Sequence, residues 1–382
     1  MKKLIIFIIL LIINTLFSYA QWEECKGLSG KNVRCIAVKG DTIFAGTWGE
    51  GVFLSTDNGN SWTTKNNGLT NLIVNCIAIT DDKIFIGIWE GGVFLSTDNG
   101  ENWIARNNGI EILEVLSLAI NDNKIFAGEI GLYYSTDKGN NWIFDIGTYI
   151  IYSIDISNDT VILGTDYGIF LSSDNGQNWS NKTTDEISFR HIYSIAICNN
   201  NYIIGVELKG IFISTDNGYN WIEKNNGLKN LQIYSIANIR NYIFAGTGNG
   251  IFLTSNLGNK WIEKNDGLTN LHINSIIISG NRIFAGTFGG LFKSSISKLT
   301  STGLINNIDT NSFEIIPNPA YDILIIKNQN NKNLRFKIIN LFGIIVSQGL
   351  LTEEKTILNI SGLSSGVYFF RVGCETTKFI KQ

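Results

Sequence analysis

The sequence contains very little proline, with 2 residues in a chain of 382. An average chain of this length would carry about 19 prolines. Both of them, Pro317 and Pro319, fall near the C-terminal end, so they indicate a change of domain there. Long apolar runs are also scarce, because after residue 20 no stretch approaches the ~18 apolar residues that a membrane helix requires.

Cysteine and histidine are rare as well. Five cysteines are an odd number, so we expect no disulfide framework in an exported chain. They are Cys25, Cys35, Cys76, Cys198 and Cys374. The two histidines, His191 and His272, leave little material for a zinc site or a catalytic triad. We therefore expect both to be ordinary loop or strand-end residues, and we predict no metal and no cofactor.

Positive charge is scarce in the main body. Residues 21–312 hold 20 Lys+Arg against 28 Asp+Glu (net −8), whereas residues 313–382 hold 8 against 5 (net +3). An acidic body without a basic stripe argues against nucleic acid as a partner. Residues 1–20 have a basic start, an apolar run and Ser18-Tyr19-Ala20 before Gln21, which is typical of a cleaved signal peptide. We therefore expect a secreted or outer-surface protein with no stable membrane span after cleavage.

What the sequence has in abundance is an internal repeat. One box, Ser-x-Asp-x-Gly-x-x-Trp, is clearest at residues 55–62 and 96–103, and successive tryptophans lie 37 to 42 residues apart. The glycine of Ile-Phe-Ala-Gly or its equivalent recurs seven times, from Gly46 to Gly286. Each unit contains four short runs rich in β-branched and aromatic residues, separated by Asp, Asn and Gly turns. Four strands in about 40 residues predict one blade of a β-propeller, with a linear β-solenoid as the competing architecture.

The two ends of the array favour a closed ring. The seventh unit has three runs but no box, whereas residues 22–28 match the fourth run of the other units. We therefore predict an all-β fold with a seven-bladed propeller over residues 21–298. An N-terminal strand completes the last blade and removes the open sheet edges. Seven tryptophans then occupy one equivalent position, which leaves Trp48 and Trp89 unexplained.

The box resembles the Asp-box, or BNR, repeat of sialidases, sortilin-type receptors and several secreted propellers. Its aspartate can accept backbone N–H groups across the turn, its glycine can take a positive φ, and its tryptophan packs over the hairpin. These structural aspartates are Asp57, Asp98, Asp137, Asp174 and Asp216. The resemblance does not extend to an activity, because the chain offers no clear arginine triad of a sialidase. Xyloglucanase-like hydrolases use a cleft between two propellers, and one is present here.

A different pattern follows a Ser-, Thr- and Asn-rich linker at residues 299–312. Pro-Asn-Pro-Ala at 317–320, Leu-Ser-Ser-Gly-Val-Tyr at 363–368 and a lysine-bearing end appear in that order. Residues 313–382 thus resemble the type A C-terminal sorting domain of the type IX secretion system of Bacteroidota. The resemblance implies a small Ig-like β-sandwich that the secretion machinery recognises and that is commonly cleaved off. A generic adhesive sandwich is the alternative.

Candidate ligand-binding residues come from the loops after each repeated glycine, because propellers usually bind ligands at the mouth of the central channel. Carboxylates accept hydrogen bonds from sugar hydroxyl groups, and exposed aromatic rings stack on sugars. The candidates are Trp48, Glu50, Trp89, Glu90, Glu129, Asp166, Tyr167, Glu207 and Phe288. We expect a glycan- or protein-binding module without a catalytic residue. A glycoside hydrolase, or loop tips that are merely solvated, are the alternatives.

Overall fold

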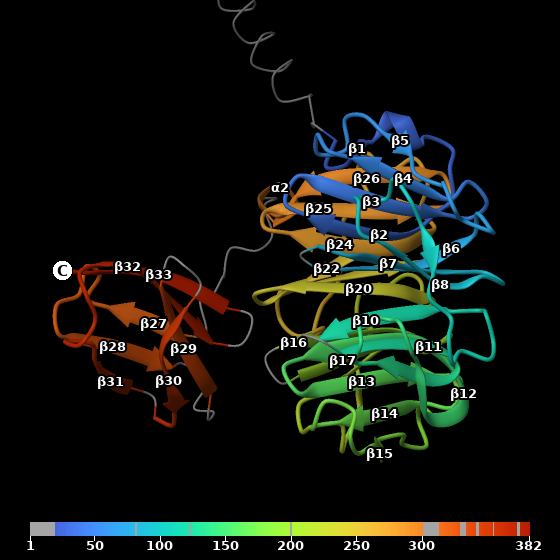
Figure 1. Cartoon of the computed structure of the whole chain (residues 1–382). Helices are drawn as coiled ribbons and strands as arrows, with labels where there is room; N and C mark the ends of the chain where they lie inside the picture. Colours follow the sequence, from blue (N-terminus) through green and yellow to red (C-terminus); the bar gives the residue numbers. More distant parts are fainter. Residues whose placement is uncertain are drawn as a thin grey trace, which may run out of the picture.

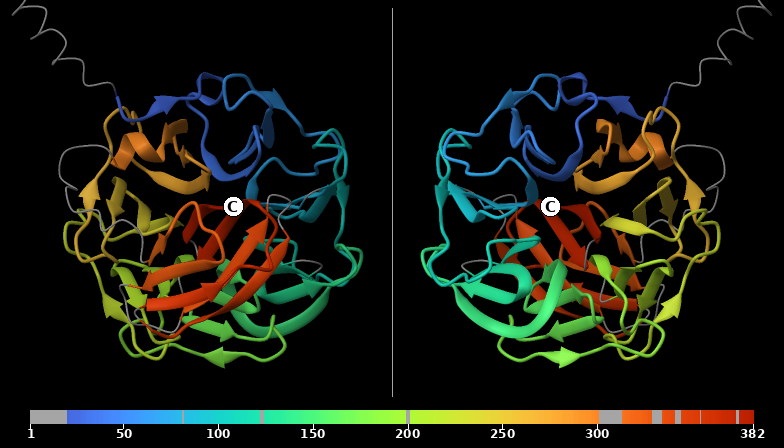
Figure 2. Two further views of the ribbon diagram at one scale, coloured as in Figure 1. Left: turned by 90° about the vertical axis from the view of Figure 1, so that its left-hand side faces the viewer. Right: turned by 90° about the vertical axis from the view of Figure 1, so that its right-hand side faces the viewer.

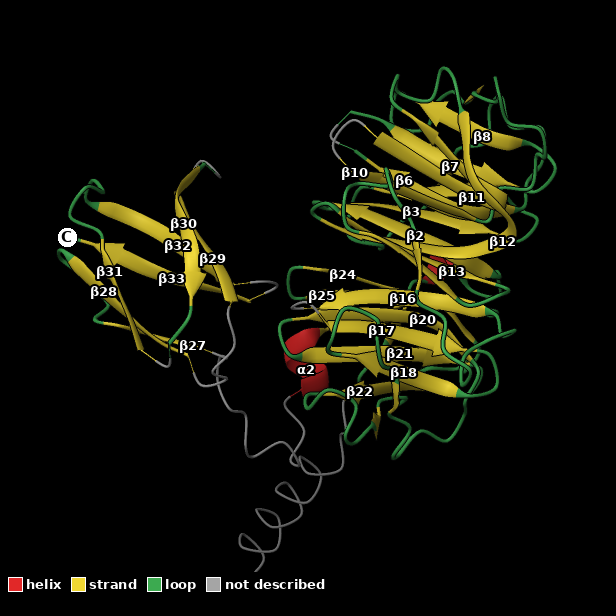
Figure 3. Cartoon of the chain, turned by 90° about the horizontal axis from the view of Figure 1, so that it is seen from below, coloured by secondary structure: helices red, strands yellow, loops and turns green. Residues whose placement is uncertain are grey.

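The computed structural model describes residues 20–80, 82–121, 124–198, 201–300, 313–328, 334–340, 344–353, 355–372 and 375–382. Within these ranges the regular secondary structure is almost entirely strand, and the helical segments are the 3-10 turn η1 (Lys26–Leu28) and the short helix α2 (Ile296–Thr300) (Figure 3). The expected all-β class is confirmed. The predicted signal peptide up to residue 19, the linker from residue 301 and Cys374 lie outside the described residues.

Residues 20–300 form six antiparallel sheets, five with four strands and one with six (Figure 1). The first four-stranded sheet contains β2 (Val33–Lys39), β3 (Thr42–Thr47), β4 (Val52–Ser55) and β5 (Thr63–Thr64). The next contains β6 (Val74–Ile79), β7 (Ile84–Ile88), β8 (Gly92–Ser96) and β9 (Ile104–Ala105). A third contains β16 (Ile192–Cys198), β17 (Asn201–Val206), β18 (Gly210–Ser214) and β19 (Ile222–Glu223). A fourth contains β20 (Ile233–Ile239), β21 (Tyr242–Thr247), β22 (Gly250–Thr254) and β23 (Ile262–Glu263).

The six-stranded sheet contains two units that share one strand. Its strands are β10 (Ser117–Asn121), β11 (Lys124–Ser135), β12 (Ile143–Ser157), β13 (Thr160–Thr165), β14 (Ile169–Ser172) and β15 (Ser180–Asn181). The first part of β12 pairs with β11 and its second part pairs with β13. The strand is therefore the last of one unit and the first of the next.

The sheets are arranged in a ring (Figure 2). Neighbouring first strands contact one another in the order β2, β6, β10, β12, β16, β20 and β24 (Ile273–Ser279), and β24 contacts β2 again. The core lies between adjacent sheets, where Phe44 and Leu54 of one sheet pack with Ile84 and Phe94 of the next. Second and third strands are thus buried on both faces, which explains why they read as continuous apolar runs.

The repeated glycines lie where neighbouring sheets converge. A Cβ atom on Gly46 would stand 2.5 Å from the Cys35 sulfur and 2.7 Å from Cγ1 of Val74 on the next sheet. Real Cβ atoms do not approach other atoms so closely, so this position requires glycine. Close packing of the sheets near the axis therefore imposes the Ile-Phe-Ala-Gly pattern.

The two ends of the ring meet in one sheet. β24, β25 (Arg282–Thr287) and β26 (Gly290–Ser295) are joined by the N-terminal strand β1 (Glu23–Glu24), which pairs with β26 in the register Glu23↔Lys293 and Glu24↔Phe292. Trp22 is 1% exposed, and its indole N–H donates to the carbonyl of Lys264 at 2.8 Å. The predicted completion of the last sheet by the N-terminus is present in the structure.

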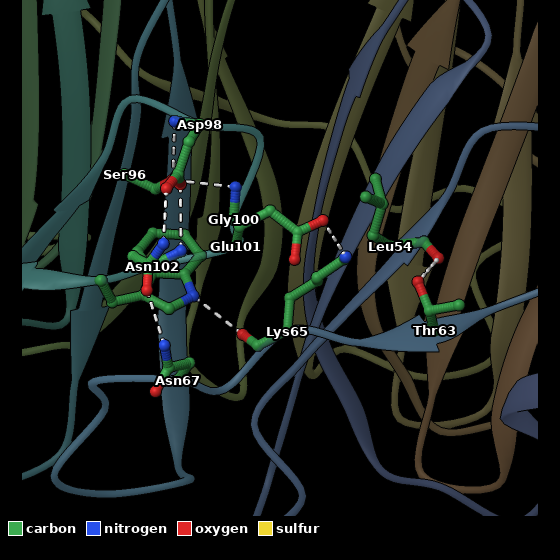
Figure 4. A network of polar contacts seen from close by, with 10 residues as sticks. Leu54, Thr63, Lys65, Asn67, Ser96, Asp98, Gly100, Glu101 and Asn102 are labelled. Atoms are coloured by element: carbon green, nitrogen blue, oxygen red, sulfur yellow. Dashed lines mark hydrogen bonds and ion pairs between the residues drawn. The ribbon is translucent and has the colours of Figure 1, made fainter.

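The box turns hold their hairpins together, and most of their tryptophans also link the hairpin to the preceding sheet; Figure 4 shows one such turn. Asp98 accepts hydrogen bonds from the Ser96 hydroxyl at 2.8 Å and from the backbone N–H of Asn102 at 3.0 Å. The Gly100 N–H donates to the Ser96 hydroxyl at 2.8 Å. These hydrogen bonds hold the pKa of Asp98 at about 2. The indole N–H of Trp103 donates to the carbonyl of Lys65 on the preceding sheet at 2.8 Å.

Residues 313–382 form two further antiparallel sheets. One contains β27 (Phe313–Ile316), β28 (Ile323–Asn328) and β31 (Lys355–Asn359), and the other contains β30 (Ile345–Leu351), β29 (Leu334–Asn340), β32 (Gly366–Val372) and β33 (Glu375–Lys381). Leu324 and Ile326 of the first sheet share one core with Phe336, Ile338 and Phe370 of the second.

Candidate functional site

One end of the ring gathers two kinds of loop. Loops between the second and third strands are hydrogen-bonded to the segments that connect one sheet with the next. The N–H of Gly49 donates to the carbonyl of Leu72 at 3.1 Å, and the N–H of Gly210 donates to that of Leu231 at 3.1 Å. We call this end the mouth face. Eight of the nine predicted ligand-binding residues lie in segments that follow a second strand, and the ninth, Glu129, lies within β11.

The first strands carry a repeated irregularity close to the mouth face. In six of them the register shifts directly after the first residue that pairs with the second strand, which leaves the next residue as a β-bulge. We call these bulged residues the bulge ring. They are Arg34, Asn75, Tyr152, Tyr193, Tyr234 and Asn274. Bulges re-aim side chains, so the irregularity presents these six in equivalent positions around the axis.

Aromatic rings form a continuous arc along part of the bulge ring. Tyr152 and Tyr193 have ring centroids 5.1 Å apart, and Tyr193 and Tyr234 are 5.9 Å apart. Tyr234 then contacts His272 at 4.7 Å, and His272 stacks on Phe288 at 3.7 Å. We call these five residues, together with His191, the aromatic arc. It spans four consecutive first strands and gives the mouth face an extended aromatic surface.

Glu207 is hydrogen-bonded within the arc. The Tyr193 hydroxyl donates to a Glu207 oxygen at 3.1 Å, and Nδ1 of His191 lies 2.9 Å from the same hydroxyl. Burial, followed by the charge of Glu207, raises the pKa of Tyr193. Burial lowers the pKa of His272. The arc therefore places tyrosine and histidine rings beside one carboxylate.

The two unexplained tryptophans form a second aromatic group. Trp48 and Trp89 lie on neighbouring sheets with ring centroids 6.1 Å apart, and Trp48 is 46% exposed. The guanidinium carbon of Arg34 lies 4.6 Å from the Trp48 ring centroid, a cation–π arrangement. A cation and two indoles thus occupy the part of the mouth face that the aromatic arc leaves open.

Other predicted residues take part in local contacts. Glu50 forms an ion pair with Lys31, and Asp166 accepts the N–H of Ile150 at 3.0 Å. Tyr167 stacks on Tyr149 with ring centroids 5.4 Å apart. Glu90 is exposed and has a φ of 53°. The prediction of one shared surface remains a proposal, because these contacts distribute the residues among several small groups.

Glu129 differs from the expected surface position. It is 1% exposed, and among the described residues neither carboxylate oxygen has a partner at hydrogen-bonding distance and angle. Burial raises the pKa of Glu129 to about 7, against opposing effects of the Tyr133 hydroxyl and of the backbone at Ile112 and Glu114. The residue lies inside β11, where the sequence suggested a loop. The side chain of Glu129 is therefore buried inside the protein and does not lie on the surface of the mouth face.

The sequence interpretation missed the bulge ring and the part that both histidines play in the aromatic arc. His191 and His272 were expected to be ordinary loop or strand-end residues; they lie directly before β16 and β24, and both also belong to the arc. A signal was available in the first strands, which read Val-Arg-Cys, Val-Asn-Cys, Ile-Tyr-Ser three times, and Ile-Asn-Ser. The variable middle residue of each triplet is the bulged one. Aligning these triplets, rather than the loops alone, points to the ring.

Among the described residues, no cluster of three or more His, Cys, Asp and Glu side chains is placed to hold a metal ion. Cys25, Cys35, Cys76 and Cys198 form no disulfide among the described residues. A search of the same residues for a helix of sufficient length and apolarity to cross a bilayer finds none.

Solved structures show the fold class of the ring. The extracellular domain of BT4673 from B. thetaiotaomicron matches with a TM-score of 0.62 and 19% identity over 82% of this chain and 47% of that one. PorZ, a surface component of the type IX secretion system of Porphyromonas gingivalis, matches with a TM-score of 0.53 and 18% identity; the match covers 91% of this chain and 59% of PorZ. The GH74 enzyme of Niastella koreensis matches with a TM-score of 0.59 and 12% identity; the match covers 94% of this chain and 74% of the enzyme.

This chain spans about half the length of the BT4673 domain. No curated protein is similar in sequence. The three structural matches define a propeller-like body of nearly all β-structure.

The C-terminal part is assigned by its own match. Residues 314–382 fit the family described as the secretion system C-terminal sorting domain. The chain is therefore a propeller-like protein with a type IX sorting tail, which directs it to the outer surface or the extracellular space.

Proposed function

We propose that the protein is an extracellular recognition module that binds its ligand at the mouth face. In this proposal the ring is a seven-bladed propeller of Asp-box repeats over residues 21–298. The six-stranded sheet counts as two blades because β12 serves both. Residues 313–382 form an Ig-like sandwich that engages the type IX machinery. No catalytic role is assigned to any residue.

The observation that carries the proposal is a pair of apolar side chains on strained backbone. Phe189 is 72% exposed with a φ of 53°, and Leu208 is 65% exposed with a φ of 56°. Large residues rarely adopt such φ values, and strain of this kind tends to accumulate at functional sites. Hydrogen bonds between their loops, from Glu207 N–H to the His191 carbonyl and from Lys209 Nζ to the Glu186 carbonyl, are both 2.9 Å.

Exposed leucine and phenylalanine suit a protein surface better than a sugar. Sugars bind through hydroxyl groups and aromatic faces, whereas protein interfaces bury aromatic and aliphatic anchors in their centres. Equivalent leucines at 36–38% exposure recur around the same face, namely Leu72, Leu113, Leu231 and Leu271. We therefore infer an extracellular protein as the preferred ligand class.

A glycan is the second candidate. The exposed Trp48 beside Trp89 offers a stacking surface, with the carboxylates of Glu50 and Glu90 on the same loops. Hydrolysis has less support, because Glu50, Asp166 and Glu207 are all engaged in ion pairs or hydrogen bonds. A glycosidase requires two carboxyl groups placed on either side of the scissile bond.

The test uses the full secreted chain on two arrays. One array carries purified surface and secreted proteins of the host bacterium and its surroundings, and the other carries glycans. We expect saturable protein binding that the double variant Phe189→Ser, Leu208→Ser reduces at least tenfold. Ile222→Ser is the matched control, because Ile222 is 53% exposed on the outer strand β19.

Glycan binding that Trp48→Ala or Trp89→Ala abolishes, with no protein bound, would favour the second candidate. Turnover of chromogenic glycosides would contradict both the protein-binding and the glycan-binding proposal.

A further inference from the structure

Arg34 is an unpaired cation in an otherwise neutral set. The other five members of the bulge ring are tyrosines and asparagines. Arg34 is half-buried, and among the described residues it forms no ion pair or hydrogen bond, its polar contact being the face of Trp48. By contrast, Arg282 pairs with Asp41 at 2.9 Å. The charge of the Glu114 carboxylate acts on Arg34 from a distance, but burial dominates and lowers the pKa of the guanidinium. A partly desolvated guanidinium that forms no ion pair is incompletely stabilised, so it marks a place where a ligand anion is stabilised.

The neighbouring member of the ring supplies an unpaired acceptor. Asn75 occupies the same bulge position on β6, which lies beside β2. It is 8% exposed, and its amide N–H donates to the Val115 carbonyl at 3.0 Å. Its Oδ1 atom is buried without a partner among the described residues. A buried amide oxygen normally accepts a hydrogen bond, so a donor is missing here.

Apolar groups border these two polar ones. Trp48 and Trp89 lie 6.1 Å apart, and the carbonyl of Leu72 accepts the N–H of Gly49, the residue after Trp48. Leu72 is 38% exposed. A cation, a vacant acceptor and an apolar border therefore occur together on two adjacent sheets.

We propose that this group, which we call the Arg34 site, binds the C-terminal residue of a peptide or protein ligand. The terminal carboxylate pairs with Arg34, the N–H of the same residue donates to Oδ1 of Asn75, and the apolar side chain packs against Trp48, Trp89 and Leu72. Only one carbon atom separates the N–H from the carboxylate in a terminal residue, so one residue can satisfy both polar groups. The inference rests on the proposed function and specifies which part of a protein ligand is recognised.

The test uses the full secreted chain and an array of degenerate pentapeptides attached through their N-termini. Each sequence is present twice, once with a free C-terminal carboxylate and once as the carboxamide. We expect binding to the carboxylate form with apolar last residues, and at least a tenfold loss for the carboxamide. Arg34→Gln should lose at least tenfold in affinity, and Arg34→Lys should retain part of it because the charge remains without the planar fork.

Two further variants separate binding from folding. Asn75→Asp places an anion on the strand next to that of Arg34, so we expect it to abolish peptide binding. It also loses the amide donor to the Val115 carbonyl, so we expect a lower melting temperature with an unchanged far-UV circular dichroism spectrum, which shows that the variant is folded. Arg240→Gln is the matched control, because Arg240 is an exposed arginine on the hairpin between β20 and β21, and it should bind like the wild type.

Equal binding of carboxylate and carboxamide peptides would overturn the inference, as would full affinity in a folded Arg34→Gln variant or no peptide bound at all. Binding of uronate-containing glycans that Arg34→Gln abolishes would assign the site to acidic sugars instead. If protein ligands still require Phe189 and Leu208 while amidation has no effect, the proposed function stands and only the Arg34 site fails.

Discussion

Glu129 replaces a side chain that elsewhere closes the mouth-face loops. The Thr47 hydroxyl donates to the Gly51 carbonyl at 2.8 Å, and the Thr247 hydroxyl donates to that of Gly250 at 2.9 Å. Both threonines directly follow the repeated glycine, as Glu129 follows Gly128. At this position in β11, therefore, a titratable carboxyl group stands where other sheets carry a small hydroxyl group.

The stability of the ring should consequently depend on pH through Glu129. Its folded-state pKa of about 7 lies above the ordinary 4.5, so its contribution is fully present below pH 4.5 and is lost as the pH rises to about 7. Glu129→Gln should raise the free energy of unfolding by about 2 kcal/mol at pH 8 and change it little at pH 4. Urea unfolding at both pH values measures this, with the exposed Glu90→Gln as control. Identical pH profiles of wild type and Glu129→Gln would contradict it.

Glu129 also shows where sequence reasoning ended. The repeat pattern identifies the glycine, but it predicts that a loop starts at the residue after it. In the structure that residue still belongs to the second strand and points into the protein, as the burial of Thr47 and Thr247 at 1% and 0% exposure shows. Residue type alone did not reveal this, because a glutamate at a buried position has the same sequence signature as one at a loop tip.

At the scale of the strand, the four-run pattern predicted most elements and failed where one unit departs from the rest. β11 combines the second and third strands without a separate loop, and β12 continues from one unit into the next. The connecting segment after Trp142 lacks the Asn-Asn-Gly-Leu turn that separates the strands at residues 66–69. Without that turn the chain has no signal to leave the extended conformation, and register shifts absorb the difference.

The box tryptophans should contribute unequally to stability. Trp103 is 3% exposed and bonds to the preceding sheet, whereas Trp62 is half-buried and its indole N–H donates to Gly59 of its own turn at 3.3 Å. We expect Trp103→Ala to lower the free energy of unfolding by about 3–5 kcal/mol and Trp62→Ala by less than half as much. Chemical denaturation of both variants measures the difference, and equal losses would refute the link between sheets as the cause.

At the scale of the whole molecule, β1 closes the ring. It covers the edge of β26, and the buried Trp22 anchors it to the preceding sheet. A mature chain that starts at Ser29 should therefore expose a strand edge, melt at a lower temperature and associate into larger species. Light scattering after size-exclusion chromatography detects this, with Glu23→Ala as a control on an exposed side chain of the same strand. A monodisperse truncated chain with unchanged melting temperature would show that the ring closes without β1.

The sorting domain should decide the location of the protein independently of ligand binding. A chain that ends at residue 300 lacks the matched region 314–382 and should remain in the periplasm. Trp48→Ala in the full chain should still reach the outer surface or the medium. Cell fractionation and immunoblotting distinguish the compartments, and equal export of both chains would assign the export signal elsewhere.

The position of β26 has a mechanical consequence. A force applied to the C-terminal tail would reach the ring through α2 and then β26. That strand is hydrogen-bonded on both edges, to β25 and to β1. Tension along it must break two ladders together instead of peeling a single edge strand. The sheet that closes the ring is thus also the one that would bear such a load, and its double pairing resists unravelling from the C-terminal side of the ring.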